Sequence, residues 1–124
     1  MRIIALEEHF ATPEFLDGPG RGFMDRFADV GQRVSQFAGS LGGLVDKLGD
    51  VGAGRIAEMN AAGIDVQVLS LTSPGLEQLP AAAAVPMAQR TNDFLAAAIG
   101  GNPTRFAGFA ALPTADPPAA AERD

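Results

Sequence analysis

Apolar and β-branched residues are concentrated in three short runs, at residues 2–6 (RIIAL), 64–71 (IDVQVLSL) and 105–112 (RFAGFAAL). Each run has the length of a strand and is bounded by polar or turn-forming residues, so we predict a strand for each. The second run is mostly apolar on both of its faces, which is typical of a parallel strand covered on both sides.

Helical spacing separates these runs. Residues 55–62 (RIAEMNAA) predict a helix, and Gly63 follows at the position of a helix C-cap. Residues 85–99 predict a second, longer helix, and Asp116 with Pro117 is typical of the cap and first turn of a third. Strands that alternate with helices in this order indicate βαβ units, a parallel sheet and the α/β fold class.

The segment between the first strand and the first helix is weakly patterned. Residues 15–51 are rich in glycine, and Gly18, Pro19 and Gly20 form a strong turn signal. We predict a long variable loop here, with short helical turns near Phe15 and over residues 24–27 and 34–48. Residues 1–124 then form one partial domain with 15–51 as its variable part.

Composition excludes several classes of protein. The 124 residues suffice for about one small domain, and the absence of cysteine rules out disulfides and thiolate metal ligands. No stretch approaches the ~20 apolar residues of a membrane span, and Glu7 and Glu8 end the first apolar run too early for a signal peptide. The net charge is −6 and the nine basic residues are scattered, which argues against a nucleic-acid partner. We therefore expect a cytoplasmic protein with no membrane or nucleic-acid partner.

Glu7, Glu8 and His9 stand at the carboxyl end of the first predicted strand, the end where parallel barrels build their active sites. Alternation along a strand puts Glu7 and His9 on one side and Glu8 on the other. A carboxylate and an imidazole placed so can both bind one divalent ion such as zinc or manganese. The alternative is a chance Glu-x-His, because His9 is the only histidine and a catalytic zinc site needs about three protein ligands.

Three segments, in this order, resemble the decarboxylating branch of the amidohydrolase superfamily. They are ALEEHFATPE (5–14), RIAEMNAAGIDVQVLSLTSPG (55–75) and RTNDFLAAAIGGNPTRFAGFAALPTADP (90–117). That branch includes the γ-resorcylate, 2,3-dihydroxybenzoate, 5-carboxyvanillate and aminocarboxymuconate semialdehyde decarboxylases. The resemblance implies the N-terminal portion of a (β/α)8 TIM barrel with about three strands, incomplete because such a barrel takes ~250 residues.

The resemblance also implies roles for particular residues. Glu7 and His9 match the family's first-strand metal ligands, and a glutamate at the first position favours a decarboxylase over a hydrolase. The family's further ligands, a histidine and an aspartate, come from later strands, so we assign no catalytic residue in this chain. Arg55 matches an arginine that helps to hold the substrate carboxylate in some members, and Phe10 and Phe23 are candidates for lining an aromatic pocket. The alternatives are a solvated helix arginine and phenylalanines that only pack.

As a whole, the resemblance implies nonoxidative decarboxylation of a hydroxybenzoate-like aromatic acid by a full-length homo-oligomer that contains zinc or manganese. The chain by itself would be inactive. One alternative is a hydrolase of the same superfamily, in which the metal activates water. Another is a noncatalytic fragment or interaction module, because an unpaired sheet edge promotes association. We also expect the isolated chain to fold poorly, because the apolar faces of its strands would lie uncovered.

Overall fold

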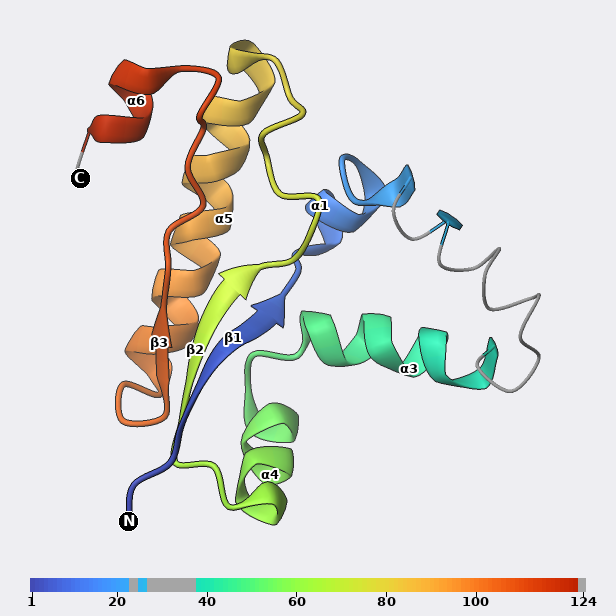
Figure 1. Ribbon diagram of the computed structural model, residues 1–124, viewed down its shortest axis with the longest axis vertical. Helices are drawn as coiled ribbons and strands as arrows, with labels where there is room; N and C mark the ends of the chain where they lie inside the picture. Colours follow the sequence, from blue (N-terminus) through green and yellow to red (C-terminus); the bar gives the residue numbers. More distant parts are fainter. Residues whose placement is uncertain (23–24, 27–37, 123–124) are drawn as a thin grey trace.

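The computed structural model describes residues 1–22, 25–26 and 38–122. Within that part, strands and helices alternate along the chain as predicted (Figure 1). The elements are β1 (Ile4–Phe10), α1 (Pro13–Asp17), α3 (Ala38–Gly49), α4 (Ala53–Ala62), β2 (Val66–Leu71), α5 (Ala81–Gly101), β3 (Phe106–Gly108) and α6 (Pro117–Ala121). The three strands form one open parallel sheet in the order β1-β2-β3, so the predicted α/β class with a parallel sheet is confirmed.

Two strands differ in extent from the prediction. β1 does not end before Glu7 but continues to Phe10, which pairs with Leu71 at the end of β2. β3 is confined to Phe106–Gly108 within the predicted run 105–112. The reason in both cases is pairing with β2, which continues along β1 as far as Phe10 and holds only residues 106–108 of the third predicted run.

The helix α5 begins at Ala81, four residues before the predicted start at Val85. Alanine has the highest helix propensity, so the run of alanines ahead of Val85 extends the helix. Pro86 lies inside α5 and removes one backbone hydrogen bond near its beginning, which a helix of this length tolerates. The predicted caps are present: Gly63 ends α4 with a φ of 72°, and Asp116 Oδ1 accepts a hydrogen bond from Ala119 N at 3.1 Å.

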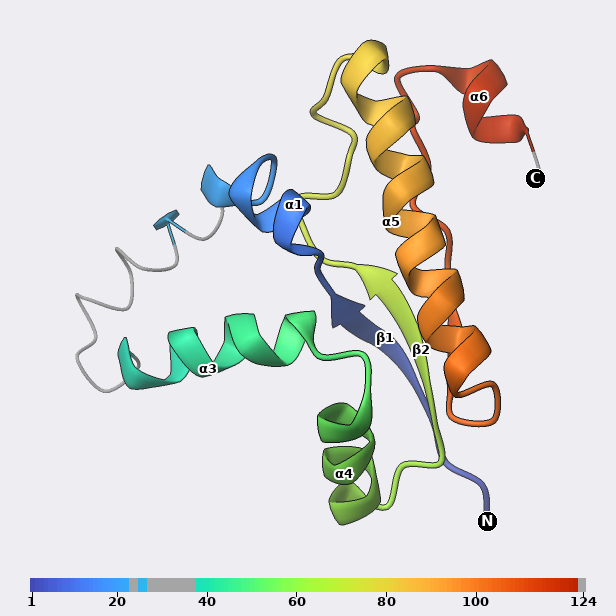
Figure 2. The ribbon, with the colours of Figure 1, turned by 180° about the vertical axis from the view of Figure 1, so that it is seen from behind.

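The helices α4 and α5 cover one face of the sheet, and Figure 2 shows α5 in front of it. The main core lies between these layers and consists of Phe10, Met59, Leu69, Leu95 and Phe106, each at most 4% exposed. Burying a large apolar side chain stabilises a fold by roughly 1.5–3 kcal/mol, so this face accounts for much of the stability.

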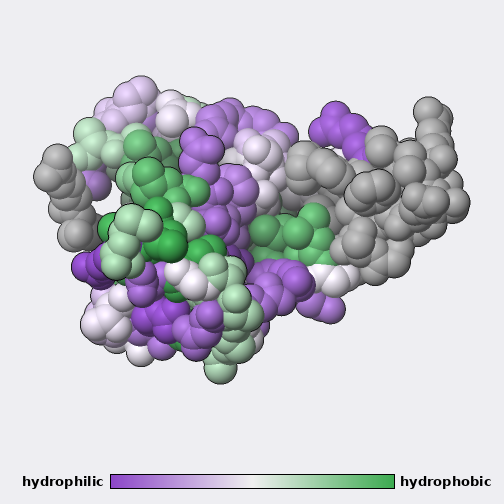
Figure 3. Space-filling view, turned by 60° about the horizontal axis from the view of Figure 1, so that its bottom comes forward, coloured by the Kyte–Doolittle hydropathy of each residue, from purple (hydrophilic) through white to green (hydrophobic). Residues whose placement is uncertain are grey.

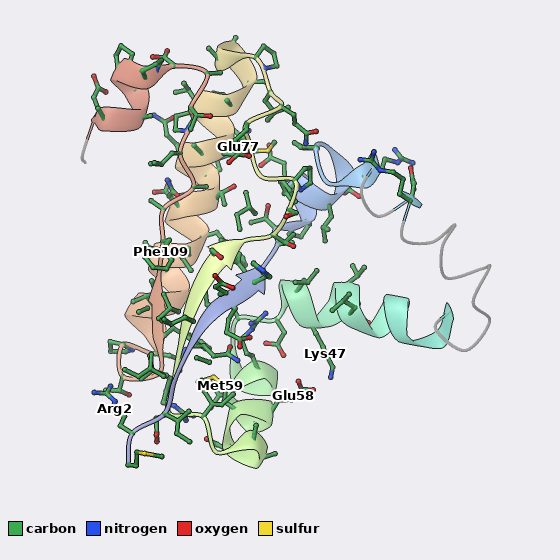
Figure 4. The ribbon with its side chains drawn as sticks, viewed as in Figure 1. Arg2, Lys47, Glu58, Met59, Glu77 and Phe109 are labelled. Atoms are coloured by element: carbon green, nitrogen blue, oxygen red, sulfur yellow. The ribbon has the colours of Figure 1, made fainter. Side chains whose placement is uncertain are left out.

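The opposite face of the sheet is open. Ile4 and Leu6 of β1 are 51% and 65% exposed, and Phe109, just after β3, is 62% exposed (labelled in Figure 4). In space-filling view, apolar residues reach the surface among polar ones (Figure 3). The expectation that apolar faces lie uncovered therefore holds for one face of the sheet and is wrong for the face under α4 and α5. None of the helices described is long and apolar enough to cross a membrane.

Candidate metal centre

The strand β1 contains a β-bulge at the predicted metal ligands. The pairing with β2 shifts between Ala5 and Glu8, so that Leu6 and Glu7 together lie opposite a single residue of β2. Glu7 has a φ of 61°, in the left-handed region that residues other than glycine rarely adopt. Strained backbone of this kind is concentrated at functional sites, so the bulge marks Glu7 independently of its side chain.

The register assigns the residues of the motif to the two faces of the sheet. Partners on neighbouring parallel strands point to the same side. Glu8 lies opposite Leu69, a core residue, and so belongs to the face covered by helices. His9 lies opposite Ser70 on the open face, to which the bulge also assigns the exposed Glu7. The predicted grouping of Glu7 with His9 and away from Glu8 thus agrees with the pairing.

A cavity of about 500 Å³ lies at the edge of the sheet, between β1 and the helices α3 and α4. Glu7, Glu8 and His9 border it from the strand, and Arg55 borders it from α4. At its outer side, Lys47 of α3 reaches toward Glu58 of α4 and forms an ion pair with an N–O distance of 2.8 Å (Figure 4). Both side chains are more than 60% exposed, so this ion pair stabilises the fold by about 1 kcal/mol at most.

Arg55 connects the carboxyl end of β1 to neighbouring segments through hydrogen bonds. Its Nη2 donates to the backbone carbonyls of His9 and Lys47, both at 2.9 Å. Its Nε donates to the carbonyl of Asp50 at 2.6 Å, and its Nη1 donates to Gln67 Oε1 at 3.2 Å. Burial lowers the pKa of Arg55, and three nearby carboxylates oppose that shift. All three guanidinium nitrogens are engaged within the fold, which supports a structural role; contact with a substrate stays a prediction.

The imidazole of His9 contacts the neighbouring strand. Its Nδ1 lies 3.3 Å from Ser70 Oγ, within hydrogen-bonding distance. Ser70 was not among the site residues predicted from the sequence. The signal that was available is a hydroxyl near the end of an otherwise apolar strand, in register with the only histidine.

Of the two phenylalanines predicted to line an aromatic pocket, the structure describes only Phe10. Phe10 is 1% exposed and stacks on Phe94, with ring centroids 6.0 Å apart and an interplanar angle of 16°. This position supports the alternative of a packing role for Phe10. Phe23 lies outside the described residues.

The donors fit part of a metal site. Glu7 supplies a carboxylate and His9 an imidazole, and both ligand types suit manganese or zinc. Among the residues that the structure describes, no group of three or more His, Cys, Asp or Glu side chains could hold a metal ion. Further ligands would therefore have to come from elsewhere.

Known proteins match the chain in sequence over almost its whole length. It is 38% identical over 122 residues to a γ-resorcylate decarboxylase of Rhizobium sp., which covers 96% of this chain and 33% of the relative. It is 40% identical over 119 residues to the γ-resorcylate decarboxylase of Polaromonas sp., covering 95% and 32%. The chain therefore spans about a third of the length of these curated relatives. No family model matches it.

Solved structures match the fold as well. One is the dihydroxybenzoic acid decarboxylase of Polaromonas sp. with bound manganese and the inhibitor 2-nitroresorcinol, with a TM-score of 0.77 and 38% identity over 97% of this chain and 33% of that one. Another is the 5-carboxyvanillate decarboxylase of Novosphingobium aromaticivorans with manganese and a nitrobenzoic acid, with a TM-score of 0.72 and 37% identity over 90% and 34%.

The open parallel sheet and its helices thus correspond to about a third of a TIM-barrel enzyme. In sequence and in fold the chain resembles about a third of the amidohydrolase-type aromatic decarboxylases, which include the γ-resorcylate and 5-carboxyvanillate enzymes. The resemblance predicted from the sequence is confirmed.

Proposed function

We propose that this chain is part of a divalent-metal-dependent decarboxylase that releases carbon dioxide from a hydroxylated aromatic acid, and that Glu7 and His9 hold the metal. One observation carries the proposal. In a chain related to manganese-containing decarboxylases, this pair lies on the open face of the sheet beside a strained bulge. The inhibitor and the aromatic acids in the solved relatives support a substrate of hydroxybenzoate type.

The chain's own contribution is to fix two donors in place. Pairing with β2 holds the backbone on both sides of the bulge, and Arg55 holds the carbonyl of His9. A bound divalent cation supplies a Lewis acid and a template for the oxygen atoms of a substrate. The cation can orient a substrate only if its protein ligands are held rigidly, because catalysis depends on orientation as well as on charge.

The test uses the complete gene product, meaning the protein encoded by the whole reading frame that contains this chain. After removal of metal with a chelator, manganese or zinc is added back and carbon dioxide release from 2,6-dihydroxybenzoate is measured. We expect release that depends on the added metal. The matched control is 3,5-dihydroxybenzoate, which has no hydroxyl beside the carboxylate for the metal to hold and should react far more slowly.

Release without metal, or equal rates with both isomers, would contradict the proposal. Hydrolysis of amides or lactones in place of carbon dioxide release would favour the hydrolase of the same superfamily. Inactivity of the metal-loaded protein toward both reactions would favour a noncatalytic interaction module.

A further inference from the structure

We propose that Ser70 is a positioning residue that sets the tautomer of His9, keeping the proton on Nδ1 so that Nε2 offers its lone pair to the metal. This inference deepens the proposed function and rests on it, because it concerns the same imidazole. Its basis is the contact between two residues that the fold places side by side on neighbouring strands.

The register fixes this contact. His9 and Ser70 are direct partners on β1 and β2, and Ser70 Oγ lies 3.3 Å from His9 Nδ1. β2 is the central strand, and Ser70 directly follows the three residues of β2 that pair with β3. Ser70 itself is half-buried, whereas His9 is exposed. The serine is therefore the fixed partner and the imidazole the group that is oriented.

The contact with Ser70 matters because it can decide which nitrogen of the imidazole carries the proton. A neutral ring carries one N–H and one lone pair, and only the nitrogen with the lone pair can bind a metal. Free histidine in water favours the proton on Nε2, which would leave that atom unable to bind. A hydroxyl oxygen that accepts a hydrogen bond from Nδ1–H favours the opposite tautomer. Histidine ligands in metalloproteins almost always have such a partner for the second ring nitrogen.

The same hydroxyl could instead donate its proton to Nδ1, which would keep the ring proton on Nε2. The two arrangements share one distance and differ only in the position of a proton. They predict opposite tautomers, which nitrogen chemical shifts of the ring distinguish directly. A merely structural serine would leave the tautomer unchanged when it is replaced.

The experiment is ¹⁵N NMR of histidine-labelled gene product without metal, in mildly alkaline solution where a histidine ring is neutral. The His9 signals are identified by their loss in a His9→Gln variant. We expect the proton on Nδ1 in the wild type, a shift toward Nε2–H in Ser70→Ala, and recovery in Ser70→Thr, which keeps the hydroxyl. Thr104→Ala is the matched control, because it removes a hydroxyl at the opposite end of the sheet and should change nothing.

Manganese affinity, measured separately, should fall about tenfold in Ser70→Ala and recover in Ser70→Thr. A wild-type ring protonated on Nε2, or a tautomer that does not change in Ser70→Ala, overturns the inference. If the tautomer follows Ser70 but no variant binds manganese, the proposed function fails while the role of Ser70 in setting the tautomer is supported.

Discussion

At Glu7, a strained backbone coincides with the carboxylate that we assign to the metal site. The φ of 61° would be adopted freely by glycine, whereas any residue with a Cβ loses about 1 kcal/mol or more there. A glutamate in this conformation therefore lowers the stability of the fold, and the proposed role of its carboxylate is the compensating gain.

We predict that Glu7→Gly is more stable than Glu7→Ala by about 1 kcal/mol, because both variants lack the carboxylate and only alanine retains the Cβ. Urea unfolding of the complete gene product measures the difference. Both variants should bind manganese equally poorly. An alanine variant as stable as the glycine variant would show that the bulge is not strained at this residue.

Arg55 is the second residue with a testable role. We predict that Arg55→Met destabilises the protein by about 1.5–3 kcal/mol, because it removes the charged donor of three backbone carbonyl groups, among them that of His9. Arg55→Lys should restore only a small part of this, since an ammonium group cannot donate in several fixed directions as a guanidinium does. Denaturant midpoints provide the measurement. Full rescue by lysine would indicate that charge alone matters at this position.

At the scale of elements, the sequence predicted the type and order of the strands and helices but not their pairing. Gly63 was predicted at its cap because a helix end needs a residue tolerant of positive φ, which is a local requirement. The bulge in β1, the early end of β3 and the contact of Arg55 with His9 depend on residues more than 35 positions apart. Local pattern contains no such information, so these features appear only in the fold.

The contact between α1 and α5 gives a prediction about pH. Arg90 of α5 donates from Nε and Nη2 to the two carboxylate oxygens of Glu14, at 2.9 and 2.5 Å. This hydrogen bonding lowers the pKa of Glu14 below its ordinary value of 4.5, although burial opposes the shift. The pair therefore stabilises the fold above that value, and the stabilisation is lost as pH falls through the lower pKa of the folded state.

We accordingly expect Glu14→Gln to lower the thermal midpoint at about pH 7 and to have a smaller effect at about pH 3, because the unfolded state binds the proton below the ordinary value of 4.5. Circular dichroism at a series of pH values measures this. Adding Arg90→Gln to Glu14→Gln should change the midpoint at neutral pH only slightly more, since the pair is already broken. An equal difference at both pH values would assign the effect of Glu14→Gln to packing.

In the molecule as a whole, helices cover one face of the sheet and leave the other face open. The core residues under α4 and α5 are buried, whereas Leu6 and Phe109 are exposed on the open side. We predict that the 124 residues, produced alone, self-associate through this face and lack a sharp thermal transition. Sedimentation velocity should show that Leu6→Thr with Phe109→Thr reduces association, while Leu44→Thr on α3 does not. A monomer with a cooperative transition would prove this wrong.

The most direct test of the account is manganese binding by the metal-free gene product, followed through the electron paramagnetic resonance signal of free Mn²⁺. Glu7→Gln and Glu8→Gln are the decisive pair, because they remove adjacent carboxylates assigned to opposite faces of the same strand. We predict that Glu7→Gln weakens manganese binding by more than about tenfold and that Glu8→Gln leaves it nearly unchanged. Replacing a residue that only hydrogen-bonds a metal ligand already weakens metal binding by about tenfold, so the loss of a ligand itself should cost more. Equal losses in both variants, or a loss in Glu8→Gln alone, would contradict the assignment of Glu7 and His9 to the metal.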